Sequence, residues 1–273
     1  MRFYRELEKW GNMPELSILL PSLRPLEVEK RIAEFAKTDP DVDYEIIIVS
    51  PFPVSGEKVA HLLETEKKGV LFAMNEAYKK ASGEYVIPWS DDAAPRENCL
   101  QNILSFVKSQ NPEIPFVAGF AKESPRGAGF GQWQVYGKLY AGWLCASKKT
   151  IERAGGLFDT VYKNYWGDPD FCLRVWEKGG RVEICKNAVI KIGQIDDEIK
   201  SSNLNSCFEH DTETFFNRWH DKLGGRSKKV WWLINCEVPN CFSDHVRAFL
   251  RHIPYLKLLK DNAISATRKF KTG

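Results

Sequence analysis

The chain has 273 residues, of which 43% are hydrophobic, and this is enough for one large packed domain or a domain with an appendage. The formal net charge of +3 is unevenly spread, since residues 1–221 carry −5 and residues 222–273 carry +8. No apolar run approaches the roughly 18 residues of a membrane-spanning helix, and residues 1–8 lack the apolar middle of a secretory signal. The sequence therefore predicts a cytoplasmic protein that at most lies on the inner face of a membrane.

The seven cysteines contain no Cys-x-x-Cys pair, which argues against a zinc site or a thioredoxin-type redox motif. Several have apolar neighbours in the sequence, such as Cys145, which follows Trp143-Leu144. We expect reduced and mostly buried thiols, as in a cytosolic protein.

The first 120 residues alternate β-type runs with amphipathic helical runs. Strands are predicted at 16–20, 44–49, 70–72, 85–89 and 114–120, and helices at 26–37, 56–66, 74–81 and 96–109. The alternation predicts an α/β fold with a Rossmann-like, mainly parallel sheet flanked by helices on both faces. Ligands of such sheets bind beyond the carboxyl ends of the strands. Pro21, Ser22, Ser50 and the turn Ser90-Asp91-Asp92 should therefore meet around one crevice.

The second half begins with residues 121–140, a glycine-rich and aromatic segment that predicts a mobile loop over a substrate. A strand is predicted at 141–146, and then a helix from an N-cap at Ser147 to Ala154. Asp168-Pro169 opens the next helix, which ends at Gly179-Gly180. A strand at 181–192 and a helix at 211–223 complete a domain over residues 1–225.

Residues 226–273 are predicted to form a basic, aromatic, helical extension of that domain. Its segments 230–234 and 244–260 combine Trp, Phe, Leu and Ile with Arg and Lys. Such a composition suits peripheral contact with the headgroup region of a membrane, where cations meet anionic lipid. The alternative is a helix packed on the domain with its charges in water.

Two adjacent carboxylates, Asp91 and Asp92, follow the apolar run Tyr85–Trp89. Carboxylate oxygens suit a hard divalent cation and, through the cation, a diphosphate. A second acidic cluster contains Asp168 and Asp170. A metal and a base are the two parts that a sugar-transfer site requires. The alternative for each cluster is an N-cap, before residues 96–109 for the first and at the following helix for the second.

The order and spacing of these segments resemble family 2 of the GT-A glycosyltransferases, which transfer sugar from a nucleotide-diphosphate sugar. The matching stretches, within about residues 14 to 222, are Leu16–Ser22, Gly69–Asn75, Gly83–Tyr85, Gly155–Asp159 and Trp166–Arg174. The resemblance implies an inverting, hexosyl-type transfer assisted by Mn²⁺ or Mg²⁺. It also implies a nucleotide-sugar donor, a glycan or lipid-linked acceptor, a place in polysaccharide biosynthesis, and no nucleic-acid partner.

The resemblance also implies roles for single residues. Asp92 stands at the metal position, Ser90 where the family has another Asp, and Ser50 where the family has an Asp that recognises the base. Asp168 aligns with the catalytic base. The implied donor contacts are Pro21, Ser22, Ser50, Lys68, Asn75, Ser90, Asp91 and Lys191, and the implied acceptor contacts are Trp166 and Asp170.

Two further positions depart from the family pattern, and the choice of the base stays open. Gly167 stands where the family often has Glu, and Lys191 lies where it commonly has a metal- or diphosphate-binding histidine, a role that His210 or His220 could also fill. Because a helix N-terminus stabilises negative charge, we expect Asp168 to be ionised at neutral pH. Asp170 remains the alternative to Asp168 as the base.

Other nucleotide-binding classes lack their motifs here. No Gly-x-Gly-x-x-Gly follows the first strand, as a dehydrogenase needs, and no Gly-Lys-Ser or Gly-Lys-Thr of a P-loop occurs. The glycine-rich basic opening loop of a nucleotidyltransferase is also absent. The strongest rival is a GT-A-like domain that binds a sugar nucleotide or glycan without turnover, since Ser50, Ser90 and Gly167 replace acidic residues.

Overall fold

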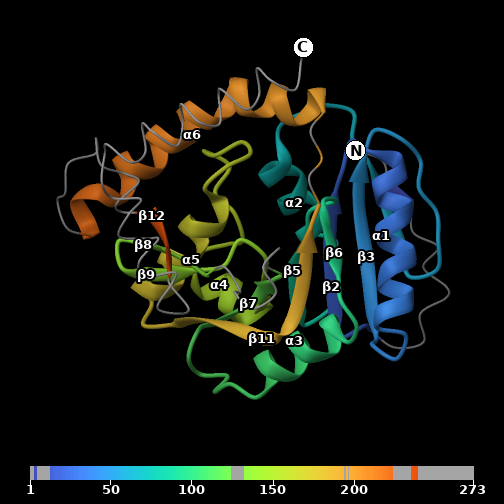
Figure 1. The fold of residues 1–273 in the computed structure, drawn as a ribbon, viewed down its shortest axis with the longest axis horizontal. Helices are drawn as coiled ribbons and strands as arrows, with labels where there is room; N and C mark the ends of the chain where they lie inside the picture. The colour runs from blue at the N-terminus through green and yellow to red at the C-terminus, as the bar shows by residue number, and fades with distance from the viewer. Residues whose placement is uncertain are drawn as a thin grey trace, which may run out of the picture.

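The computed structural model describes residues 3–4, 13–123, 132–193, 195, 197–223 and 235–238 (Figure 1). The helices are α1 Pro25–Thr38, α2 Val70–Tyr78, α3 Cys99–Lys108, α4 Lys148–Arg153, α5 Gly167–Glu177 and α6 Glu198–Leu223. The strands are β1 Phe3–Tyr4, β2 Leu16–Pro21, β3 Tyr44–Ser50, β4 Val59–Leu63, β5 Tyr85–Pro88, β6 Ala93–Pro95, β7 Phe116–Lys122, β8 Gln132–Val135, β9 Lys138–Tyr140, β10 Leu144–Ser147, β11 Arg181–Ile192 and β12 Asn235–Val238.

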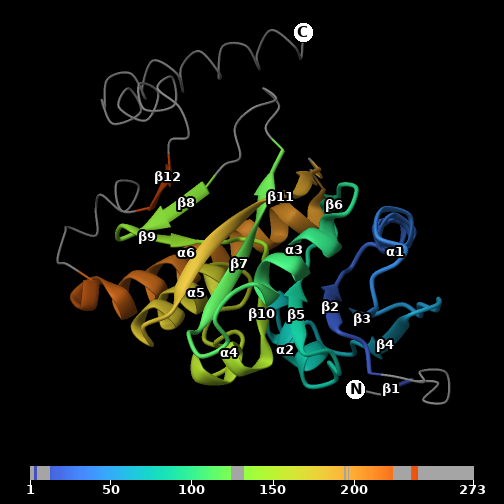
Figure 2. The same ribbon diagram turned by 90° about the horizontal axis from the view of Figure 1, so that it is seen from below.

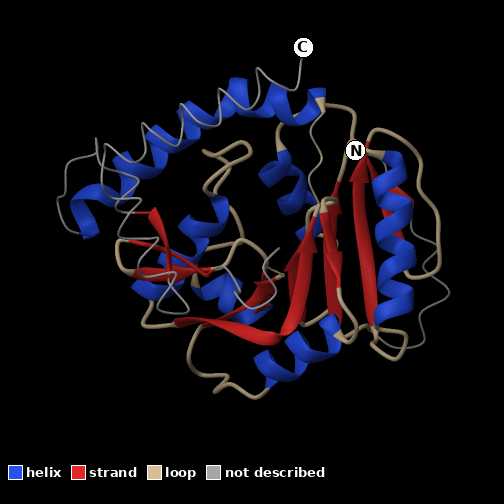
Figure 3. Ribbon diagram, in the orientation of Figure 1, coloured by secondary structure: helices blue, strands red, loops and turns tan. Residues whose placement is uncertain are grey.

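Nine strands form the main sheet in the order β1-β4-β3-β2-β5-β10-β7-β11-β6 (Figure 3). Strands β4, β3, β2 and β5 run parallel, as expected from the crossover pattern. Beyond them the sheet is mixed, because β10 is antiparallel to both neighbours and β6 is antiparallel to β11. A separate antiparallel sheet has the order β12-β8-β9.

Two hydrophobic cores lie on the two faces of the main sheet, which Figure 2 shows between α1 and α3 on one side and α2 and α4 on the other. Because side chains alternate along a strand, Ile18 and Leu20 of β2 enter the core with α1 and α3, whereas Leu19 enters the core with α2, α4, α5 and α6. Both faces of β2 are thus covered, which explains its apolar run Ile18–Pro21.

Two sequence predictions in the first half are wrong. Residues 56–66 contain strand β4 instead of a helix, because parallel pairing with β3 overrides the helical preference of its Ala and Leu residues. Residues 70–72 begin helix α2 instead of forming a strand. A short apolar run cannot distinguish these states by itself, and Gly69, with φ 104°, turns the chain into the helix.

The second half agrees better with the predictions. Ser147 is the N-cap of α4 and accepts a hydrogen bond from the Thr150 N–H (3.1 Å). Helix α5 has Trp166 at its N-cap, however, so Asp168 is not the cap residue. Helix α6 begins at Glu198 and is longer than the predicted 211–223 helix.

The remaining predictions fall partly outside the described residues. Within 121–140 the structure describes a hairpin of β8 and β9, and residues 124–131 are not described. Of the extension 226–273 only β12 is described, and it is a strand where a helix was predicted. No helix in the described ranges has the length and apolar character that crossing a bilayer requires. Five cysteines are described with their side chains, and all five are buried free thiols.

Candidate active site

The turn between β5 and β6 presents Asp92 at the carboxyl end of the parallel strands. The Ser90 hydroxyl donates to Asp92 Oδ1 (2.6 Å), and the indole Nε1 of Trp143 donates to Ser90 Oγ (2.8 Å). The backbone carbonyl of Asp92 accepts from the Gly193 N–H (2.6 Å) at the end of β11. Ser90 therefore orients the carboxylate of Asp92, a partly exposed residue for which the sequence resemblance implies metal binding.

The neighbouring Asp91 is engaged inside the protein. Its carboxylate is almost fully buried and accepts from the Ser22 hydroxyl (2.5 Å) and from Nη1 of Arg24 (3.0 and 3.1 Å). Arg24 also forms a two-point ion pair with Asp197 at the start of α6 (2.6 and 2.9 Å). Hydrogen bonds and charge from the carboxylates of Asp197 and Asp91 raise the pKa of the Arg24 guanidinium. In turn, the hydrogen bond that Arg24 donates lowers the pKa of Asp197.

Sequence reasoning missed Arg24 and Asp197. Arg24 comes two residues after Ser22, so the topological argument that placed Ser22 at the crevice could have found it. Asp197 carries no comparable signal, because only the fold brings the start of α6 to the end of β2.

Asp168 is the second residue of α5, so its carboxylate lies at the positive end of the helix dipole. Burial among surrounding groups raises the pKa of Asp168 to about 6, although the residue as a whole is partly exposed. Its own backbone N–H and the Lys122 ammonium act in the opposite direction. A Cβ at Gly142 would lie 3.2 Å from Asp168 Oδ2, so the segment before β10 approaches this carboxylate through a residue without a side chain.

The segment Gly142-Trp143 links the two acidic clusters. Gly142 adjoins Asp168, and Trp143 binds Ser90 of the Asp92 turn. The Lys122 ammonium lies 4.5 Å from the centre of the Trp143 ring and also acts on Asp168. The structure thus brings together two clusters that are far apart in the sequence, and it adds Lys122 and Trp143, which sequence reasoning did not identify.

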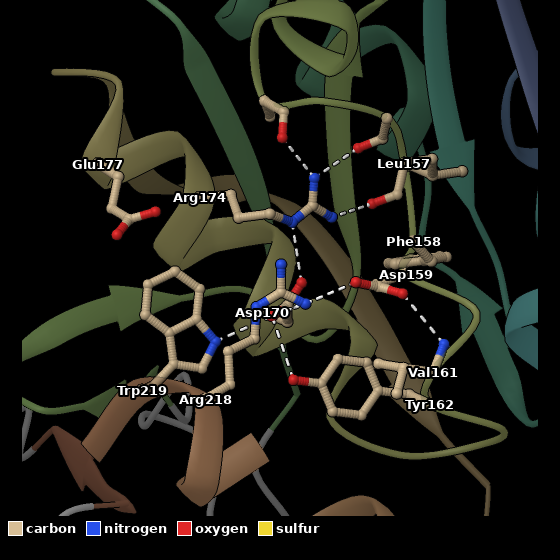
Figure 4. A network of polar contacts seen from close by, with 12 residues as sticks. Leu157, Phe158, Asp159, Val161, Tyr162, Asp170, Arg174, Glu177, Arg218 and Trp219 are labelled. Carbon is tan, nitrogen blue, oxygen red and sulfur yellow. Dashed lines mark hydrogen bonds and ion pairs between the residues drawn. The ribbon is translucent and has the colours of Figure 1, made fainter. Parts of the chain in front are cut away.

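Asp170, two residues further along α5, lies in a polar network (Figure 4). It has no exposed surface and accepts from Arg174 Nε (2.8 Å), Trp219 Nε1 (2.9 Å) and the Tyr162 hydroxyl (3.2 Å), with Arg218 at 3.4 Å. The Arg174 guanidinium also donates to the carbonyls of Ala154, Gly156 and Leu157. Because protein donors surround its carboxylate, Asp170 ties α5 to α6, and the acceptor-binding role expected for it gains no support.

Two of the expected donor contacts also use their side chains within the protein. The Ser50 hydroxyl, fully buried, donates to the Phe52 carbonyl (2.7 Å) and lies 3.0 Å from Nε2 of His61. The side-chain amide of Asn75 makes two hydrogen bonds with the backbone of Phe158. Its Nδ2 donates to the Phe158 carbonyl (2.7 Å), and its Oδ1 accepts from the Phe158 N–H (3.1 Å).

Lysines and aromatic residues among the expected contacts differ in accessibility. Lys68 is exposed and pairs with Glu66 (2.8 Å). Lys191 is exposed on β11 and is in register with Ala94, two residues after Asp92, so it lies beside the Asp92 turn. Trp166, expected to contact the acceptor, is 7% exposed and packs in the core against α6.

The two histidines considered as substitutes both lie on α6. His210 Nδ1 is 3.1 Å from Asp211 Oδ1, and His220 Nδ1 is 3.5 Å from the hydroxyl of Tyr136. These contacts give both imidazoles partners within the domain.

Gly167 explains one departure from the family pattern. A Cβ added there would lie 2.7 Å from a methyl group of Leu71 and 3.2 Å from the ring of Phe158. Both neighbours are buried, so a Glu at this position would have no room.

The ligand set at the Asp92 turn suits a cation that arrives with a diphosphate. In the described parts of the chain, no three His, Cys, Asp or Glu residues are grouped to hold a metal ion. Mg²⁺ in phosphate sites is typically bound by one or two carboxylates, with substrate phosphates and water as the other ligands. The single carboxylate of Asp92 fits that arrangement.

Together these features define an α/β domain of the GT-A type with a carboxylate turn and a second carboxylate at one end of its sheet. The structure is similar to mannosyltransferase PcManGT from Pyrobaculum calidifontis in complex with GDP-Man and Mn²⁺, with TM-score 0.59 and 17% identity over 95% of this chain and 76% of that chain. It is also similar to GalNAc-T7 with UDP, GalNAc and Mn²⁺, with TM-score 0.55 and 10% identity over 89% of this chain and 57% of that chain.

At these identities the likeness concerns the fold, and it confirms the fold class predicted from the sequence. No family model matches the chain. A comparison with curated proteins finds no match either.

Proposed function

We propose that the chain is a metal-dependent, inverting glycosyltransferase that moves a hexosyl group from a nucleotide-diphosphate sugar to a glycan or lipid-linked acceptor. The observation that carries the proposal is the pairing of Asp92 and Asp168 at one site through Gly142-Trp143. Support comes from the two similar structures, which are complexes of sugar-transfer proteins with nucleotides and Mn²⁺.

In this proposal Asp92 holds Mn²⁺ or Mg²⁺, and the Ser90 hydroxyl orients its carboxylate. The bound cation would stabilise the negative charge that develops on the departing nucleoside diphosphate. Lys191, beside the same turn, is suited to a diphosphate as a point charge. Pro21 and Ser22 are proposed to meet the donor through their backbone, since the Ser22 side chain binds Asp91.

Asp168 is proposed to remove the proton of the acceptor hydroxyl as that oxygen attacks the sugar from the face opposite the diphosphate. With a pKa of about 6, about nine tenths of this carboxylate is ionised at pH 7, and it is a stronger base than an ordinary Asp. Lys122 keeps the pKa from rising further.

The test is a screen of nucleotide sugars for binding and transfer with Mn²⁺ or Mg²⁺, repeated with Asp168→Asn. We expect transfer from at least one donor, loss of transfer in the variant, and a donor affinity within about threefold of the wild type, because only the base is removed. Glu213→Gln on α6, exposed and without an assigned role in the site, is the matched control for the loss of one carboxylate charge. Undiminished turnover in Asp168→Asn would remove Asp168 from the mechanism.

A GT-A-like domain that binds a sugar nucleotide or glycan without turnover is the second candidate. It is favoured by Ser50, whose hydroxyl is engaged by the protein, and by Asp91, whose carboxylate is bound by Arg24. Donor binding without transfer or donor hydrolysis in the same screen would select this candidate.

The division into a domain over 1–225 and a basic extension over 226–273 remains part of the proposal, together with a cytoplasmic location and a role in polysaccharide biosynthesis. The +8 charge beyond residue 221 suits contact with anionic lipid. Co-sedimentation with anionic liposomes, with and without residues 226–273, tests that contact, and equal binding of both forms would refute it.

A further inference from the structure

The turn over residues 163–166, which leads directly into α5 and Asp168, is fixed by a buried carboxylate on another helix. We propose that this residue, Asp211 of α6, positions Asp168 for catalysis. The inference rests on the proposed function, in which Asp168 is the base.

Asp211 has no exposed surface, and its carboxylate accepts hydrogen bonds from three consecutive backbone N–H groups. The N–H of Lys163 lies 3.1 Å from both carboxylate oxygens, and the N–H groups of Asn164 and Tyr165 each lie 2.9 Å from Oδ2. Hydrogen bonds to an ionised acceptor are about twice as strong as neutral ones. The carboxylate therefore fixes the path of the turn rather than a single side chain.

Helix α6 also fixes the residue that joins this turn to α5. Trp166 donates from Nε1 to the Thr212 hydroxyl (2.8 Å), and its ring stacks on Phe215 at 4.6 Å between centres. Trp166 has φ 67°, a left-handed conformation that a non-glycine residue adopts only when its surroundings hold it there. Asp168 follows two residues later, so its direction depends on this conformation.

The other side of the turn meets the N-terminus of α2. The N–H of Val70 binds Asn164 Oδ1 (3.0 Å), and the N–H of Leu71 binds the carbonyl of Lys163 (3.1 Å). A Cβ at Gly69 would lie 2.6 Å from that carbonyl, so the contact needs glycine. The turn is therefore enclosed between α2 and Asp211, and removing either side allows it to move.

The expected effect of losing Asp211 follows from this geometry. Three backbone N–H groups would lose their shared acceptor and would turn toward other partners, which displaces the start of α5. A misplacement of about 1 Å can cost about 100-fold in rate. The donor contacts proposed at the Asp92 turn belong to other segments, so donor affinity should change little.

The first experiment compares the steady-state kinetics of Asp211→Ala and Asp211→Asn. We expect kcat to fall about 100-fold in Asp211→Ala and less in Asp211→Asn, which keeps one oxygen for Asn164 and Tyr165, while donor affinity stays within about threefold. Glu213→Gln removes a charge two residues away on α6 and should match the wild type. Trp219→Phe, which removes a hydrogen bond between α6 and α5 away from the turn, is the control for stability.

These controls separate positioning from general destabilisation. If Trp219→Phe lowers the melting temperature as much as Asp211→Ala and also lowers kcat as much, Asp211 is only structural and the inference is overturned. A kcat in Asp211→Ala within about threefold of wild type overturns it too.

Hydrogen exchange of the unliganded protein tests the same contacts without reference to activity. Asp211→Ala should speed exchange at the amides of 163–165 and in the first turn of α5, while α3 on the opposite face is unchanged. Unaltered exchange at 163–165 would refute the positioning role. If the wild type transfers no sugar from any donor, the proposed function fails, while this measurement still decides whether Asp211 fixes the turn.

Discussion

Two carboxylates on one helix should respond in opposite ways to the same substitution. Burial raises the pKa of Asp168 from 3.8 to about 6, so the folded protein binds a proton at this site more tightly than the unfolded chain does. Stability contributed by Asp168 is thus full below about pH 4 and is lost as the pH rises to about 6. Since one pKa unit corresponds to about 1.4 kcal/mol, the ionised form costs the fold at most about 3 kcal/mol at pH 7.

Asn resembles the neutral acid, so Asp168→Asn should stabilise the protein at pH 7 by up to about 3 kcal/mol and should have almost no effect near pH 4. Asp170→Asn is the matched control, two residues along α5. Removing its charge leaves Arg174 and Arg218 without their buried partner, and losses of about 3 to 5 kcal/mol are usual for such pairs.

The assay is denaturant unfolding of the wild type and both variants between pH 4 and pH 8, with equal slopes required for comparison. We expect a gain in stability for Asp168→Asn that grows with pH, and a loss of stability for Asp170→Asn at pH 7. A gain in stability that does not change with pH, or an Asp168→Asn variant less stable than the wild type at pH 7, would refute a cost of burying the ionised Asp168 carboxylate. This result does not depend on the donor or the acceptor.

Three further predictions concern the site and the sheet. Lys122→Met should move the acid-side midpoint of the transfer rate above about 6, because the ammonium lowers the pKa of Asp168, and an unchanged pH–rate profile would contradict this. Asp92→Ala should abolish the effect of Mn²⁺ on donor affinity in calorimetry, so a cation-dependent affinity that persists would remove Asp92 from the metal site. Gly83→Ala should destabilise the fold by about 1 to 3 kcal/mol in thermal unfolding, because the new methyl group would lie 2.8 Å from the backbone of Leu16; a wild-type melting temperature would show that the sheet adjusts freely.

The parts of the fold that could be predicted are those in which local pattern and tertiary packing agree. The mostly apolar run of β2 identified a central strand, and Ser147 before Lys148–Arg153 identified a helix start. Strand β4 could not be recognised, because its sequence suits a helix and only the neighbouring β3 selects the extended form.

The candidate site, like the fold, could be predicted only in part. Topology was sufficient to place Ser22, Asp91 and Asp92 together, since carboxyl ends of parallel strands share one edge. It could not foresee that Asp197 would pair with Arg24, because that ion pair joins residues 173 positions apart in the chain. A composition or motif contains no information on which of two adjacent carboxylates will be neutralised.

The same limit explains why the sequence left Asp168 and Asp170 as alternative bases. Residues two apart on a helix point in different directions, so a motif with both acids must place them in different surroundings. In the structure Asp170 points toward two guanidinium groups and an indole N–H, which satisfy its charge, whereas Asp168 is a partly exposed residue whose pKa is raised to about 6. A base needs a lone pair that is free to accept a proton, and a pKa near the working pH makes that transfer efficient. Because protein donors enclose the Asp170 carboxylate and the pKa of Asp168 is raised, the surroundings of α5, and not its sequence, favour Asp168 as the proposed base.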